Sequence, residues 1–132
     1  MIAFKMLDSS HDVLCSLTRD NPYEGRMVYY ENNITKRKRG WGPMACFNSL
    51  MDVYNFCKKR GWWNEKRYVI YVVKIKESKA KSLWYRSGYS NEITKTKDIP
   101  PGTIFADTIK LICKITEDMD PRIIWPKYNT KL

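Results

Sequence analysis

Four consecutive cations have the most obvious binding chemistry in this sequence: Lys36, Arg37, Lys38 and Arg39, followed closely by Trp41. Lysine and arginine side chains neutralise phosphates and carboxylates, and an indole ring beside them can stack on a base or a nucleotide. The segment therefore has the composition of an anion-binding loop. A solvated turn between two strands is the alternative, because runs of four cations also arise by chance.

A second stretch, residues 78 to 97, interleaves aromatic rings with cations. Its members are Lys79, Lys81, Trp84, Tyr85, Arg86 and Tyr89, and two further rings, Trp62 and Trp63, follow the predicted helix. Residues of these types stack on unpaired bases, and they also dominate the centres of protein–protein interfaces. Rings folded back onto the core are the third interpretation of this stretch.

Residues suited to catalysis or metal binding form no recognisable pattern. The cysteines are Cys15, Cys46, Cys57 and Cys113. They show no C-x-x-C spacing, so we expect small core residues rather than metal ligands. His11 is the only histidine, and no hydrolase or metalloprotease motif accompanies it. The sequence predicts neither a metal nor a cofactor, and it does not favour an enzyme.

The net charge of +10 is concentrated in the middle of the chain. Residues 34 to 97 hold 16 Lys or Arg and 4 Asp or Glu, a net charge of +12, whereas the remaining residues carry −2. Clustered cations raise the local concentration of polyanions and accelerate their association. We therefore expect an anionic partner, which is nucleic acid, a nucleotide or an acidic protein surface. The alternative is a lysine-rich surface that serves solubility alone.

The length of 132 residues corresponds to one domain, which we place at residues 1–132. The first residues, MIAFKMLDSSHD, are too polar for a signal peptide, and no run approaches the roughly 18 apolar residues of a membrane span. We expect a cytoplasmic protein that makes no membrane contact and keeps its thiols reduced.

Residues 49 to 60 carry the strongest helix signals. Ser49 with Asp52 three positions later resembles a capping box. One apolar stripe recurs at helical spacing: Leu50, Val53, Phe56 and Cys57. The cations at 58–60 and Gly61 suit the C-terminal end of a helix.

Strands are predicted at residues 2–6, 26–30, 44–47, 67–76 and 102–115. Both alternating sets of 67–76 are apolar, as expected of a strand that is covered on both faces. One main helix among about five strands indicates an α+β domain with a small mixed or antiparallel sheet. Residues 118–132 are expected to pack against it as a tail.

Asp107 stands out in the last predicted strand. The apolar residues Ile109, Leu111, Cys113 and Ile115 alternate along one face, and Asp107 shares their parity. A carboxylate on an apolar face must lie at the sheet margin, meet a hydrogen-bonding partner, or have a shifted pKa.

Two stretches, "GPMACFNSL" and "PPGTIFAD", together with "AFKML" and "RYVIYVVKI", resemble a family of small proteins found in bacteriophage and prokaryotic genomes. Members share a Gly-Pro-apolar-Phe-x-Ser-Leu stretch that leads into a helix, and a later Pro-Gly-Thr-x-x-Ala-Asp strand. The resemblance covers roughly residues 1 to 117 and implies no particular activity. Residues 36–39, the Trp pair and the 78–97 stretch depart most from the family pattern.

The order of a tyrosine-bearing strand, an F-x-S strand end entering a helix and a long strand is also similar to the first half of ADP-ribosyltransferase-like folds. This resemblance implies a nucleotide-using enzyme with an early Arg or His and a late catalytic Glu. His11 or Arg26, with Glu117, occupy the nearest positions, and none lies in a recognisable motif.

The sequence thus predicts a small basic binding module of phage or mobile-element type. The enzyme is the first alternative, and a structural or host-interaction phage protein is the second.

Overall fold

The computed structural model describes residues 1–10, 13–16, 27–37, 43–60, 66–80, 83–87, 90–94 and 99–124. The main sheet contains β1 (Ile2–Asp8), β2 (Leu14–Ser16), β3 (Val28–Tyr29), β4 (Ile34–Lys36), β5 (Met44–Phe47), β6 (Tyr68–Glu77) and β9 (Thr103–Lys114). A separate hairpin consists of β7 (Leu83–Ser87) and β8 (Ser90–Thr94). The described helices are α1 (Leu50–Arg60), the short 3-10 helix η2 (Glu117–Met119) and a single turn at 121–124.

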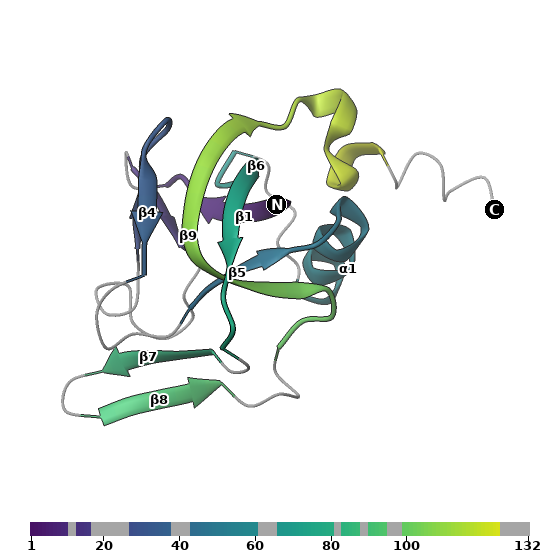
Figure 1. The fold of residues 1–132 in the computed structure, drawn as a ribbon. Helices are drawn as coiled ribbons and strands as arrows, with labels where there is room; N and C mark the ends of the chain where they lie inside the picture. Colours follow the sequence, from purple (N-terminus) through teal and green to yellow (C-terminus); the bar gives the residue numbers. More distant parts are fainter. Residues whose placement is uncertain are drawn as a thin grey trace.

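Four of the strands close into a small barrel (Figure 1). β6 pairs with β1 on one side and with β9 on the other, while β5 pairs with both β1 and β9. All four pairings are antiparallel. Beyond the barrel, β2 and β3 extend the sheet from β1, and β4 extends it from β9. The predicted α+β fold, an antiparallel sheet with one main helix, is confirmed.

The five predicted strands correspond to β1, β3, β5, β6 and β9. The short strands β2 and β4 were not predicted. The stretch at 78–97, which was predicted as a connection, contains the β7–β8 hairpin, which lies apart from the barrel in Figure 1. Short strands with few apolar residues carry little periodic signal, so their existence depends on the neighbours with which they pair.

Two bulges bend β9. Its register with β6 skips Asp107, between Ala106 and Thr108, and it skips Ile112 further along the strand. A bulge adds one residue to a strand, increases the local twist and turns the residues that follow it to the opposite face. β9 consequently curves around the barrel in Figure 1.

The bulges explain why the predicted alternation of the last strand is wrong at its end. Ile109 and Leu111 lie inside the barrel as expected. Beyond the second bulge, however, Cys113 is exposed rather than buried, and Ile115 packs on the helix side of the sheet. The first bulge likewise removes Asp107 from the apolar face, where its sequence parity had placed it.

The barrel interior forms one of two hydrophobic cores. Its most buried members come from all parts of the barrel: Ala3, Leu7, Cys46, Val73, Ala106, Ile109 and Leu111. Each fully buried aliphatic side chain of this size contributes about 1.5–3 kcal/mol relative to its exposed state. The barrel therefore supplies a rigid frame on which outward-facing side chains are held in register.

Helix α1 covers the second core, on the outer side of β1 and β6. Val53 and Cys57 are completely buried there, and both were predicted on the apolar stripe. The predicted cap is confirmed, because the Asp52 N–H donates to Ser49 Oγ at 3.2 Å, and that hydroxyl donates to the Asp52 carboxylate at 2.8 Å. The same carboxylate packs directly over Gly102, whose φ of +80° suits glycine.

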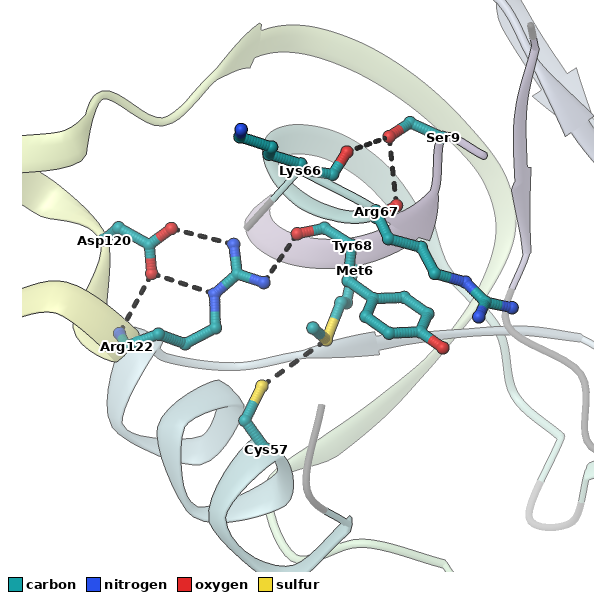
Figure 2. Close-up of polar contacts among 8 residues, drawn as sticks. All are labelled: Met6, Ser9, Cys57, Lys66, Arg67, Tyr68, Asp120 and Arg122. Carbon is teal, nitrogen blue, oxygen red and sulfur yellow. Dashed lines mark hydrogen bonds and ion pairs between the residues drawn. The ribbon is translucent and has the colours of Figure 1, made fainter. Parts of the chain in front are cut away.

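A buried ion pair fastens the chain that follows β9 to the start of β6 (Figure 2). Arg122 donates from Nη2 to Asp120 Oδ2 at 2.8 Å, from Nε to Asp120 Oδ1 at 3.0 Å, and from Nη1 to the carbonyl of Tyr68. Figure 2 also shows Cys57, whose thiol lies 3.6 Å from Met6 Sδ. Burial raises the pKa of the Cys57 thiol to about 11, although Arg122 opposes the shift.

Within the part of the chain that the structure describes, no helix has both the length and the apolar character needed to cross a membrane.

Candidate anion-binding face

Strand pairing brings lysines from three distant parts of the sequence onto one surface. β4, β9 and β6 lie side by side, and their registers align Lys36 with Thr108 and Lys76. The next outward-facing row aligns Ile34 with Lys110 and Lys74. The surface made by Lys36, Lys74, Lys76 and Lys110 is named the lysine face below.

Alternation along the strands fixes the direction of these side chains. Ile109 and Ile75, which lie between the two rows, are buried inside the barrel. Because successive residues of a strand point to opposite faces, the residues on either side of them point outward. All four cations of the lysine face are exposed, which agrees with this assignment.

The charges on this face repel one another. Lys74 and Lys110 are direct cross-strand partners, and neither of the two rows contains a carboxylate. Like charges placed directly opposite each other destabilise a sheet, by an amount comparable to the roughly 0.2–1 kcal/mol of a favourable pair. An anion bound between these lysines relieves that repulsion.

Arg37, the residue after β4, contacts a carboxylate of the protein itself. Its Nε lies 3.5 Å from Asp107 Oδ1, and its backbone N–H donates to the Asp107 carbonyl at 3.0 Å. Asp107 Oδ1 has no hydrogen-bond partner among the described residues, so its contact with Arg37 is a Coulombic attraction without hydrogen-bond geometry. The Asp107 carboxylate therefore lies in a bulge of β9, beside the guanidinium of Arg37.

The other predicted contact residues are distributed as follows. Lys79 follows β6 and is exposed, and the backbone of Trp84, Tyr85 and Arg86 lies on β7 rather than in a loop. Lys38, Arg39, Trp41, Trp62, Trp63, Lys81 and Tyr89 lie outside the described residues. The structure thus brings Lys36 together with three lysines that the sequence did not single out.

Those three lysines had a partial signal in the sequence. Lys74 and Lys76 continue the parity of Val72 at the end of the predicted 67–76 strand, and Lys110 falls on the polar parity of the last strand. Each strand therefore showed a polar end or face. The missing information was the order of the strands, because only the β4–β9–β6 arrangement joins the three lysine sets.

A different lysine, Lys5, is enclosed within the barrel. Its Nζ donates to the Ala45 carbonyl at 2.6 Å and lies 5.4 Å from the centre of the Tyr29 ring. Burial lowers the pKa of Lys5 and raises the pKa of the adjacent Cys46 thiol, and the coupling between the two groups opposes both shifts. Burial also raises the pKa of Tyr29, whose hydroxyl has no hydrogen-bond partner within the described part of the chain.

Lys5 is thus a candidate for a neutral amine, but its environment is that of a core residue. It is 7% exposed and surrounded by the apolar interior of the barrel. A charged ammonium is expensive in such surroundings unless it is paired. We therefore assign Lys5 to the stability of the barrel.

The residues that the enzyme alternative requires are not brought together among the described residues. Glu117 is exposed in η2, whereas His11 and Arg26 lie outside the described part of the chain. Within that part, no group of three His, Cys, Asp or Glu side chains is arranged to hold a metal ion.

Comparisons with protein families, with curated proteins and with solved structures give no match to this chain. Function is therefore inferred from the residues and geometry of the site itself.

Proposed function

We propose that this protein is a binding module that holds an anionic macromolecule on its lysine face. The observation that carries the proposal is the pair of outward rows across β4, β9 and β6, in which Lys74 directly opposes Lys110 and no carboxylate intervenes. A protein surface that serves solubility alone has no need for directly opposed cations. A polyanion whose charges lie between the rows turns that repulsion into attraction.

The dimensions of the lysine face favour an extended partner over a free nucleotide. Neighbouring strands are about 5 Å apart, and alternate residues along one strand are about 7 Å apart. The four cations therefore cover an exposed patch about 10 Å across three strands, on the face that points away from the barrel interior. Small ligands are usually enclosed in concave pockets, whereas chains of charge bind to exposed cationic surfaces.

The experiment compares two double variants that remove the same charge. Lys74→Ala with Lys110→Ala empties the centre of the lysine face, and Lys58→Ala with Lys59→Ala removes two exposed lysines from α1. Binding of labelled 20-mer deoxythymidylate and 20-mer polyglutamate is measured by fluorescence anisotropy across a salt series. Tight binding that weakens with salt, to either probe, is expected for the natural protein.

The first double variant should lower the salt dependence by about one unit of slope for each lost contact with the oligonucleotide. The second should leave the affinity for both probes nearly unchanged. Equal losses in both variants would mean that net charge, and not the lysine face, attracts the polyanion, and the proposal would then fail.

A further inference from the structure

β4 lies at one end of the main sheet, where one of its edges has no strand beside it among the described residues. The N–H of Arg37 donates to the Asp107 carbonyl, so residues 35 and 37 make the hydrogen bonds of this antiparallel pair. The backbone N–H and C=O groups of Ile34 and Lys36 consequently point away from β9. An extended chain beside β4 can pair with them.

The connection between β3 and β4 keeps this edge open. The Asn33 N–H donates to the Tyr30 carbonyl at 3.3 Å, and of the two central residues only Asn32 has a positive φ, of 66°. Hairpin turns of the primed types need a positive φ at the first central position, which Glu31 does not have. The two strands therefore splay apart, β3 pairing with β2 and β4 pairing with β9.

The same turn is held in place by contacts to the barrel. Glu31 accepts a hydrogen bond of 2.6 Å from the Tyr71 hydroxyl and forms a parallel bridge with Leu111. These contacts anchor one end of β4. The open edge is therefore pre-formed, which lowers the entropic cost of adding a strand to it.

Apolar side chains are exposed within the cationic surface beside this edge. Ile34 is 62% exposed and Ile112 is 47% exposed. They lie on β4 and β9, two of the strands that carry the lysine face. Ile34 is the direct partner of Lys110, so the apolar and cationic groups are interspersed. Exposed apolar side chains are common in protein-binding surfaces, whereas phosphate contacts are made by charged and polar groups.

We infer that the open edge of β4 takes an extended segment of an acidic polypeptide as an added strand. The inference rests on the proposed function, because the same lysines attract the segment. Its backbone pairs with Ile34 and Lys36, and its outward-facing side chains lie beside the side chains of these two residues, with Lys110 of β9 one strand further away. Strand addition combines backbone affinity with side-chain selectivity in this way.

A second copy of this chain is a poorer occupant of the edge. Pairing of β4 with β4 would place the lysine faces of the two copies side by side, and like charges across strands are destabilising. Nucleic acid has the right charge but no backbone amides with which to complete the ladder. An acidic polypeptide supplies both the charge and the hydrogen-bonding pattern.

The test uses labelled peptides of four Glu-Val repeats and the natural protein. In an antiparallel added strand, a residue opposite Lys36 faces outward and directs its own N–H toward β4, and the charge of Lys36 selects Glu for that position. N-methylation of the glutamates therefore removes the hydrogen bonds that the peptide donates to β4. N-methylation of the valines blocks only the far edge of the peptide and is the matched control.

The expected result is that the glutamate-methylated peptide binds at least about tenfold more weakly than the valine-methylated one. The unmodified peptide should also slow the hydrogen exchange of the Ile34 and Lys36 amides, which NMR detects residue by residue. Equal affinities of the two methylated peptides, or no change in the exchange of these amides, would overturn strand addition.

The outcome also separates this inference from the proposed function. Binding of 20-mer deoxythymidylate through Lys74 and Lys110, without binding of the peptide, would keep the lysine face as a polyanion site and assign it to nucleic acid. Absence of binding to both probes would reject the proposed function and the inference together.

Discussion

Two regions of this protein use their cations in opposite ways. Arg122 is buried, its guanidinium is bonded to both oxygens of Asp120, and a third bond reaches the Tyr68 carbonyl (Figure 2). The lysines at the centre of the lysine face are exposed, and Lys74 opposes Lys110 rather than an acid. The first arrangement is complete within the fold, whereas the second leaves positive charges opposed, which under the proposed function a partner neutralises.

The cation in the fold and the cations on the lysine face differ in their surroundings, and this difference does not depend on residue type. A buried guanidinium has lost its hydration, so the fold must supply every partner that it needs. An exposed lysine keeps its water and costs the fold little, apart from the repulsion of its neighbours. Arg37, beside Asp107, lies between these extremes, because it is half-exposed and has one internal partner.

Substitution of Arg122 by Ala should produce the largest effect of those considered. It leaves the Asp120 carboxylate buried without its cation and removes the link to Tyr68. Breaking a buried pair in this way costs about 3–5 kcal/mol of unfolding free energy. Urea denaturation followed by circular dichroism measures the loss.

The control for this substitution is Lys74→Ala, which should change the unfolding free energy by less than about 0.5 kcal/mol. Similar losses in the two variants would show that burial does not distinguish the two regions, and the comparison would break down.

Lys5 is a lysine, like the residues of the lysine face, but it is buried, like Arg122. Its titration therefore shows whether burial or residue type decides how a cation behaves. Burial lowers the pKa of Lys5 below its ordinary value of 10.5, so the unfolded chain binds this proton more tightly than the folded protein does. Its contribution to the unfolding free energy therefore falls as the pH falls from about 10.5 toward the folded pKa. The slope reaches about 1.4 kcal/mol per pH unit in that window.

The variant Lys5→Met keeps most of the length of the unbranched side chain and removes the titrating amine. The unfolding free energy of the variant minus that of the natural protein should increase as the pH is lowered from 9 to 6. Denaturation at several pH values measures this difference, in which the other titrating groups cancel. A difference that is constant with pH would mean that Lys5 keeps its proton in the barrel, and Lys110→Met is the exposed control.

The fold was largely predictable because its strongest elements carry local signals. Ser49, Asp52 and the apolar stripe defined α1, and the doubly apolar run of residues 67–76 defined β6. The alternation of β9 was predicted only as far as Leu111. Nothing in the local sequence marks the bulges at Asp107 and Ile112, because they arise from the register of β9 against β6.

The candidate site was less predictable, for a related reason. The run at 36–39 is conspicuous in the sequence, yet only Lys36 is part of the lysine face, and Arg37 contacts Asp107. Lys36 and Lys76 are far apart in the sequence, and they come into one row because both are aligned with Thr108 of β9. Charge density along the chain therefore identified the central region but not the surface, which requires knowledge of strand order.

The smallest predicted effect is also the most direct test of the lysine face. Lys74→Glu replaces a cross-strand repulsion with an attraction to Lys110, so it should raise the unfolding free energy by about 0.2–1 kcal/mol. The same variant should bind polyglutamate more weakly, because a carboxylate now stands where the polyanion would bind. Stability and affinity are thus expected to change in opposite directions.

The matched control is Lys58→Glu, which makes the same charge change near the C-terminal end of α1. There a carboxylate faces the negative end of the helix dipole, so this variant should lose a few tenths of a kcal/mol, about 0.3–1 at low salt. Thermal denaturation at low salt separates the two variants by the sign of the change, and both changes should fade at high salt because both are electrostatic. Destabilisation by Lys74→Glu would mean that its neighbours already neutralise Lys74, and the lysine face would then have no uncompensated charge to offer a partner.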